Sequence, residues 1–226
     1  IHIHVTQKIL CAHIKPCKKN SFLPKRARMT NRLTAFNRLL GINYEIVLGK
    51  KGKTTAFSIT FEKHEFYHIA GLQYLTDLRE LKTDRTLLFN RILTDDAFRQ
   101  KILKSVFISK ISDRINQLIN LEAFIDSNDT IFKYNEYAHP FSKIQADFLL
   151  MNKNIKFNLF LFLAYKQEPI CFCRSFFSDN RIDYSKNQIT MTLLYKKKSF
   201  TATSKEIILF DSISQSKGSS AENKIF

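Results

Sequence analysis

The chain has 226 residues, 44% of them hydrophobic, with 21 Phe but few Gly and Pro, which suits a folded domain and excludes a disordered or low-complexity chain. Its formal net charge of +16 favours a polyanionic partner such as nucleic acid. Residues 1–28 hold seven Lys or Arg and no Asp or Glu, so the remainder keeps 29 basic against 20 acidic residues and the basic surplus persists in weaker form.

The composition changes near both ends of the sequence. Residues 1–28 are predicted to be a basic, poorly ordered extension, with Met29 as a plausible true start. Residues 29–210 are predicted to be a single α+β domain, and the Ser-, Lys- and Gly-containing residues 211–226 a loose tail.

The four cysteines, at positions 11, 17, 171 and 173, form no Cys-x-x-Cys pair and do not suggest a disulfide framework in a chain of this length. They indicate reduced thiols and a cytoplasmic setting. The spacing near the N-terminus fits none of the usual zinc patterns, so we expect no metal there. The longest apolar run, around 157–164, is too short to span a bilayer, so we expect no membrane association.

From Met29 the chain becomes orderly. Thr30 can cap a helix whose apolar residues include Leu33 and Phe36, and Gly41 stands where a C-terminal glycine belongs. Residues 44–48 and 54–61 then alternate as two strands of a hairpin around a basic tip at 49–52.

The next segment is the one in which chemistry is expected. If residues 63–78 form one helix, then His64, His68, Gly71 and three leucines lie on one face. One interpretation is a core helix with a buried, satisfied histidine. The other is that His68 lines a site and Gly71 lets another backbone or a ligand come close.

Three further helices are predicted at 84–93, 96–103 and 108–125, the first two with Asp or Thr at their N-caps. The second half reads as β-strands at 130–134, 144–150, 155–165, 170–177, 188–195 and 199–210. The predicted fold class is therefore α+β, with an N-terminal hairpin and helices followed by a mostly antiparallel sheet.

His64-Glu65-x-x-His68 also has the letters of a zinc-peptidase helix. In that interpretation Glu65 is the general base, both histidines bind zinc, and the third ligand is Glu80 or Asp84. The pattern is short and arises often by chance.

A longer pattern of spaced residues resembles a phage-associated nuclease family of the barnase–EndoU–colicin–RelE-like superfamily. Its residues are Phe61, Phe66, His68, Gly71, Leu72, Leu75 and Asp77, then Ser105–Ile115, Ile144–Asp147, Ser175–Phe177, Asp183, Tyr184 and Gln188. The similarity covers about 39–197. It implies a barnase/RelE-like nuclease fold.

The resemblance further implies a metal-independent endoribonuclease without a cofactor, of toxin or phage-effector type, in which a ribose 2′-hydroxyl attacks the adjacent phosphate. It implies His68 as base or acid, Arg174 and Ser175 at the phosphate, and Tyr184 and Gln188 positioning the substrate. RNA is the implied partner, with tRNA and mRNA not distinguishable, and an immunity or antitoxin protein is a second one. By contrast, Lys196 and Lys197 are interpreted as an ordinary solvated strand end.

The chain departs from the family pattern where a histidine and a lysine are usual after Gly-Leu, because it has Gln73 and Tyr74. The alternative function is therefore a catalytically inactive RNA- or protein-binding module of the same fold.

Overall fold

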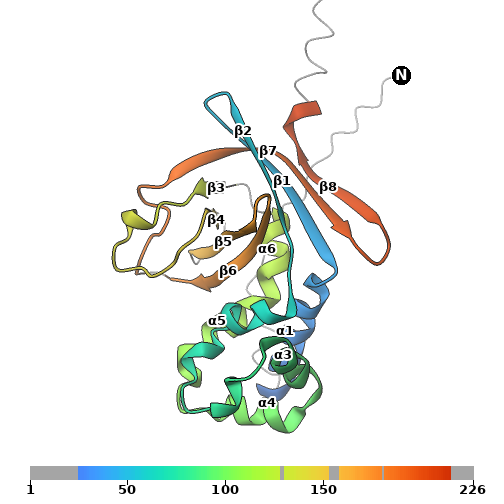
Figure 1. Ribbon diagram of the computed structural model, residues 1–226, viewed down its shortest axis with the longest axis vertical. Helices are drawn as coiled ribbons and strands as arrows, with labels where there is room; N and C mark the ends of the chain where they lie inside the picture. Colours follow the sequence, from blue (N-terminus) through green and yellow to red (C-terminus); the bar gives the residue numbers. More distant parts are fainter. Residues whose placement is uncertain (1–24, 128–129, 153–157, 180, 215–226) are drawn as a thin grey trace, which may run out of the picture.

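The computed structural model describes residues 25–127, 130–152, 158–179 and 181–214. Its helices gather at one end of the molecule and the strands at the other, with α6 running up alongside the sheet (Figure 1). The α-helices are α1 (Lys25–Leu39), α2 (Phe66–Ile69), α3 (Arg85–Thr94), α4 (Asp96–Leu103), α5 (Ser112–Gln117) and α6 (Leu121–Ser127). The 3₁₀ helices are η2 (Lys63–Glu65), η3 (Leu72–Tyr74), η4 (Arg79–Leu81), η5 (Ile108–Lys110), η6 (Leu118–Asn120) and η7 (Glu136–Ala138).

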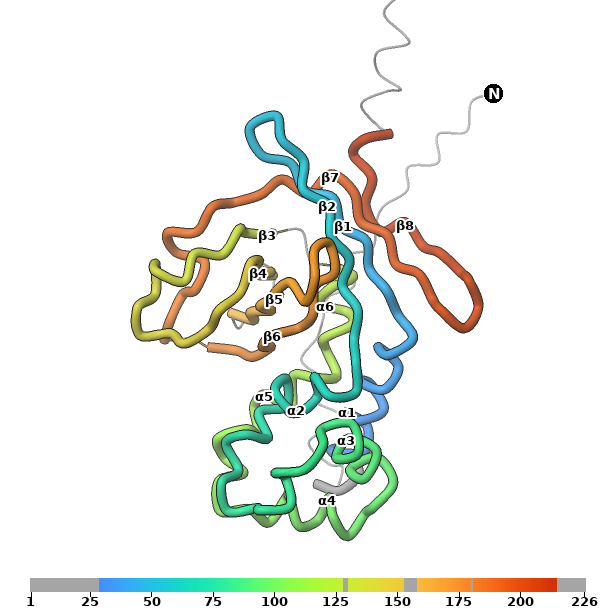
Figure 2. The backbone as a smooth tube through the Cα atoms, viewed as in Figure 1, coloured from blue at the N-terminus to red at the C-terminus, as the bar shows by residue number. Residues whose placement is uncertain are grey.

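The strands form one sheet in the order β1-β2-β6-β5-β4-β3-β7-β8. Their bounds are β1 (Ile42–Lys50), β2 (Lys53–Ile59), β3 (Thr130–Lys133), β4 (Phe148–Met151), β5 (Leu159–Gln167), β6 (Ile170–Ser178), β7 (Ile189–Phe200) and β8 (Lys205–Asp211). Because β1 also pairs with β7, the strands from β1 to β7 close into a ring, and β8 extends it beside β7 (Figure 2). The pairing is antiparallel except between β2 and β6.

The α+β class is confirmed, with one difference in arrangement. The N-terminal hairpin does not stand apart from the later strands, because β2 pairs with β6 and β1 with β7. The structure thus shows helices and a closed mixed sheet. The finer part of the prediction, a barnase/RelE-like fold, stays a prediction. The predictions for residues 1–24 and 215–226 lie outside the described residues. Within the described residues no helix is long and apolar enough to cross a membrane.

Local signals placed several elements correctly. The predicted hairpin is present, with Tyr44 opposite Ile59 and Lys50 opposite Lys53. Asp84 accepts hydrogen bonds from the first backbone amides of α3 at 3.0 and 2.9 Å, and Asp95 caps α4 at 2.9 Å. Helix α1 already begins at Lys25, before the predicted cap at Thr30.

The single helix predicted over 63–78 is wrong. The segment is divided into η2, α2 and η3, and the last break is at Gly71, which has a φ of 77°. A left-handed residue cannot continue a right-handed helix, and glycine adopts it without the steric cost of a Cβ. The predicted helix over 108–125 is likewise divided, into η5, α5, η6 and α6.

The main core lies between the helices and the sheet. Phe36 of α1 makes edge contacts with Phe61, Phe66 and Phe89, with ring centroids 5.3–6.2 Å apart. A second, smaller cluster covers the other face of the β5–β6 pair and consists of Phe132, Tyr134, Leu149, Phe160, Phe162, Phe177 and Tyr184. We call it the aromatic cluster. Cys171 and Cys173 are free thiols buried in the main core.

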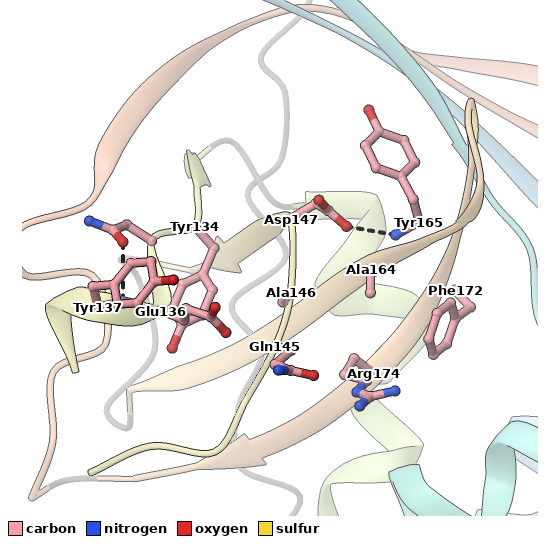
Figure 3. A pocket seen from close by; sticks show the side chains of 11 residues that line it. Tyr134, Glu136, Tyr137, Gln145, Ala146, Asp147, Ala164, Tyr165, Phe172 and Arg174 are labelled. Atoms are coloured by element: carbon pink, nitrogen blue, oxygen red, sulfur yellow. Dashed lines mark hydrogen bonds between the residues drawn. The ribbon is translucent and has the colours of Figure 1, made fainter. Parts of the chain in front are cut away.

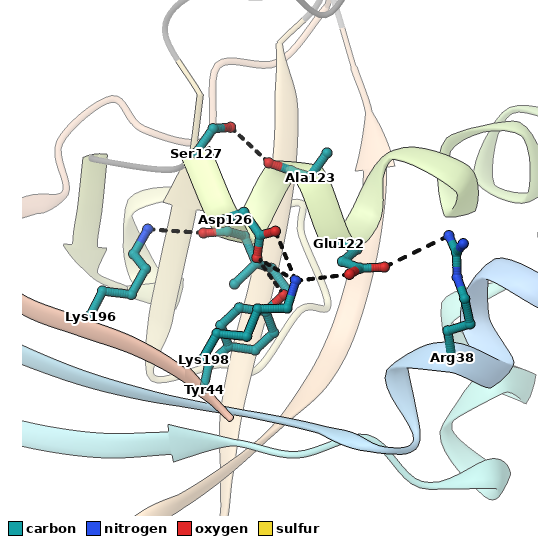
Figure 4. A network of polar contacts seen from close by, with 9 residues as sticks. Arg38, Tyr44, Glu122, Ala123, Asp126, Ser127, Lys196 and Lys198 are labelled. Atoms are coloured by element: carbon teal, nitrogen blue, oxygen red, sulfur yellow. Dashed lines mark hydrogen bonds and ion pairs between the residues drawn. The ribbon is translucent and has the colours of Figure 1, made fainter. Parts of the chain in front are cut away.

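Buried lysines join β7 to α6 (Figure 4). Lys198 is bonded to Glu122 and Asp126 at 2.8 Å each, and Tyr44 donates to Asp126 at 2.7 Å. Lys196, 1% exposed, donates to the carbonyl of Ile125 at 2.9 Å. The interpretation of Lys196 as a solvated strand end is therefore wrong, because the position faces a helix.

Candidate functional site

Strand β6 contains a bulge at Arg174. Phe162 of β5 pairs with Ser175 and the next residue, Leu163, pairs with Cys173, so Arg174 is an extra residue with no partner position. Residues directly opposite each other in a sheet share a face. Ser175 therefore shares the face of Phe162 and the aromatic cluster, while Arg174 lines a cavity with Phe172 on the same face. The bulge thus brings two consecutive polar residues to one side of the strand.

Arg114 of α5 contacts this strand directly. Its Nη1 donates to the Ser175 hydroxyl at 2.8 Å, and its guanidinium lies 4.6 Å from the ring centroid of Phe177 and 5.7 Å from that of Tyr74. Burial lowers the pKa of Arg114, which still leaves it charged at neutral pH. Sequence reasoning missed this residue, since one arginine in a helical pattern carries no special signal.

Gly71 joins the helical half to Arg114. A Cβ on Gly71 would lie 2.8 Å from the Arg114 Cδ and 3.1 Å from the Ile111 Cγ2. The group that approaches Gly71 closely is the side-chain stem of an arginine, whereas the expectation was another backbone or a ligand.

His68 lies on α2, half-buried. Burial lowers its pKa, and the positive charges of Arg85 and Arg174 lower it further. The imidazole is therefore neutral at pH 7 and able to accept a proton. Arg174 comes from the other half of the sequence, and its strand β6 packs against α2.

The remaining predicted site residues occupy supporting positions. Ser175 is 7% exposed and holds Arg114. Tyr184 is also 7% exposed, with its ring 5.2 Å from that of Phe160 in the aromatic cluster. Both ends of the Gln188 amide bond the backbone of Asn135, at 2.6 and 3.2 Å. Gln188 thus fixes the loop that begins at Asn135.

Two other residues of the spaced pattern bond each other. Asp77 accepts from the Ser105 hydroxyl at 2.7 Å and from the Val106 amide at 3.1 Å. These contacts tie the end of the α2 region to the end of α4, which indicates a structural role.

The residues needed for the zinc-peptidase interpretation do not converge. Glu80 pairs with Lys101, and Asp84 caps α3. His64 pairs with Glu62 at 3.3 Å, while Glu65, the last residue of η2, is buried. The described part of the chain contains no group of three His, Cys, Asp or Glu that could hold a metal ion.

The two residues that depart from the family pattern differ in environment. Tyr74 is 43% exposed and lies beside Arg114. Gln73 has a buried Oε1 without a hydrogen-bond partner among the described residues.

A cavity of about 450 Å³ opens next to the bulge (Figure 3). It lies between β5, β6 and the loop that leads from β3 to β4, and Arg174 and Phe172 form one side of it. Across the cavity are Tyr134 and Tyr137. Of the predicted site residues, Arg174 lines this cavity, whereas His68, Ser175, Tyr184 and Gln188 do not.

Comparison with known proteins gives one finding. A model of the family described as phage-Barnase-EndoU-ColicinE5/D-RelE like nuclease4 matches residues 28–212. Curated proteins and solved structures give no match.

Proposed function

The chain belongs to this phage-Barnase-EndoU-ColicinE5/D-RelE like nuclease family, and on that premise we propose that it is a metal-independent endoribonuclease. The observation that carries the proposal is the half-buried His68 on α2, which packs against the strand that holds Arg174; burial and nearby arginines lower the pKa of His68. A neutral imidazole beside a cation is what attack of a 2′-hydroxyl on a phosphate requires.

In the proposed reaction His68 removes the proton of the 2′-hydroxyl, and the 2′-oxygen attacks the adjacent phosphorus. The bond from phosphorus to the 5′-oxygen breaks, and that oxygen takes a proton from water. The products are a 2′,3′-cyclic phosphate and a 5′-hydroxyl, and His68 returns its proton to solvent.

Arg174 is the cation proposed to contact the phosphate, because its side chain is exposed at the bulge. Ser175 is too buried for that role. Instead its hydroxyl orients Arg114, which makes Ser175 a positioning residue. Tyr184 and Gln188 are proposed to act through the aromatic cluster and the Asn135 loop.

The phage association in the family description supports a role as a toxin or phage effector, with a cytoplasmic RNA substrate and an immunity or antitoxin protein as partner. The alternative, a binding module without turnover, is favoured by the exposed Tyr74 beside Arg114, where the family pattern has a charged side chain.

The test uses end-labelled RNA in EDTA and a matched strand with one 2′-deoxyribose at the cleaved position. We expect cleavage of the first strand, none at the deoxy position, and cyclic-phosphate ends. His68→Gln should lower the rate by about 10²–10⁴-fold with the fold intact. The matched control is His64→Gln, because His64 is an exposed histidine four residues away.

The outcomes separate the candidate functions. Cleavage that persists in His68→Gln, or at the deoxy position, would refute the mechanism. Salt-dependent RNA binding without products from the unaltered protein would support the inactive module. A metal analysis that finds no stoichiometric zinc in the purified protein would dismiss the zinc-peptidase interpretation.

A further inference from the structure

We propose that the cavity beside Arg174 binds an unpaired nucleobase of the RNA, so that the enzyme acts on single-stranded RNA. This inference rests on the proposed function for its biological meaning, although binding to the cavity can be measured without cleavage.

The cavity exists because one small residue interrupts an aromatic pattern. On β5, Phe160 and Phe162 fill their face with the aromatic cluster, and Ala164 is the next residue on that face. Ala164 lies opposite Phe172 of β6. Its methyl group leaves the space that a third phenylalanine would occupy, and the cavity of about 450 Å³ is in the range of small-ligand sites.

The lining has the chemistry of a stacking site. Phe172 and Tyr134 present rings toward the space, and Tyr137 on η7 is 83% exposed at its rim. Aromatic rings stack on nucleobases at a gain that does not depend strongly on sequence.

Cation and rings are already arranged together. The Arg174 guanidinium lies 5.9 Å from the centroid of the Phe172 ring, and the exposed amide of Gln145 lies on the same side (Figure 3). Arg174 can therefore contact a phosphate while the base attached to that nucleotide enters the cavity. Duplex RNA cannot supply such a base, because its bases are stacked and paired.

One residue, Arg174, belongs both to the cavity and to the proposed reaction. Arg174 lines the cavity and is also the cation proposed to contact the phosphate, so a nucleobase in the cavity lies next to that cation. Recognition and reaction thus share one cation.

The experiment measures binding with the full chain carrying His68→Gln, so that RNA stays intact. The probe is a short single-stranded RNA containing 2-aminopurine, whose fluorescence is quenched on stacking. We expect quenching with the single strand and little with the same strand annealed to its complement.

Three variants in that background locate the base. Ala164→Phe continues the aromatic pattern and fills the cavity, and Tyr137→Ala removes an exposed ring without disturbing the core. Each should weaken binding about tenfold and abolish or reduce the quenching. Phe210→Ala on β8 is the matched control, because Phe210 is an exposed aromatic residue (40%) on the strand that extends the ring.

Unchanged affinity and quenching in both Ala164→Phe and Tyr137→Ala would overturn the inference. If Ala164→Phe fails to fold, Tyr137→Ala decides alone. Failure of the unaltered protein to cleave RNA, with quenching that depends on Ala164 and Tyr137, would reject the proposed function and leave the cavity assignment standing. Cleavage of RNA by the unaltered protein, with quenching that neither variant changes, would reject the assignment of the cavity and leave the proposed function standing.

Discussion

Replacement of Gly71 by alanine tests whether the α2 turn and Arg114 are built to fit each other. Gly71 has a φ of 77° and Gly52, at the hairpin tip, has a φ of 76°. The two positions share a backbone conformation, which costs an alanine about 1 kcal/mol. They differ in surroundings: a Cβ on Gly52 meets nothing within 4 Å among the described residues, whereas one on Gly71 lies 2.8 Å from the Arg114 Cδ.

The Arg114 stem cannot simply move aside. Its guanidinium is held by Ser175 at 2.8 Å and lies over the Phe177 ring at 4.6 Å. Overpacking of this kind costs about 1–3 kcal/mol. Gly71→Ala should therefore lower the free energy of unfolding by about 2–4 kcal/mol, against about 1 kcal/mol for Gly52→Ala.

Urea denaturation followed by circular dichroism suits the measurement, because the chain has no Trp to report by fluorescence. A double-mutant cycle with Arg114→Ala isolates the contact. We expect the two alanine substitutions to be coupled by at least about 1 kcal/mol, since removing the Arg114 stem makes room for the new Cβ. Equal destabilisation by Gly71→Ala and Gly52→Ala, with no coupling, would refute the reasoning.

Three more predictions follow from charge and burial. Because the positive charge of Arg174 helps to lower the pKa of His68, Arg174→Ala should move the acidic limb of the pH–rate profile to higher pH. An acidic limb that stays in place would show that Arg174 does not affect the ionisation of His68. Lys198→Met leaves two carboxylates without their buried partner and should cost about 2–4 kcal/mol in urea denaturation, whereas Lys197→Met, at a partly exposed pair, should cost less than about 1 kcal/mol. Burial raises the pKa of Glu65 to about 8, so the folded state keeps a proton that the unfolded chain has lost and stability falls as pH rises through the range between the ordinary glutamate pKa and about 8. Glu65→Gln should remove that slope, of about 1.4 kcal/mol per pH unit at most, in denaturation series from pH 5 to 8.

The elements that sequence reasoning placed well are those with local causes. The hairpin is specified by alternation around a Lys-Gly tip, and α3 and α4 by the side chains of Asp84 and Asp95. The predicted helix over 63–78 failed because apolar periodicity continues through Gly71 while the backbone does not. A C-terminal glycine motif can be read at that position, but the close approach of Arg114 to it cannot.

The candidate site was only partly accessible to sequence reasoning for the same physical reason. His68 and Arg174 could be named from a spaced pattern, but the effect of the Arg174 charge on the pKa of His68 depends on the packing of α2 against β6. Arg114 and the burial of Lys196 and Lys198 depend on which residues face them across the fold. Periodicity predicts which face of a helix or strand is buried, but it does not predict which residues of other elements pack against that face.

The bulge at Arg174 shows why this residue is best explained by its charge. Cys171 and Cys173 face the main core and Phe172 faces the cavity; after the bulge Ser175 and Phe177 face the cavity side and Phe176 the core. If Arg174 were absent, Phe172, Ser175 and Phe177 would alternate regularly with Cys173 and Phe176, and every one would keep its present face. The sheet therefore does not need Arg174 for its register, and a bulge leaves the extra residue outside the ladder of hydrogen bonds. What the extra residue adds is an exposed cation in the lining of the aromatic cavity, at a point where regular alternation would place none.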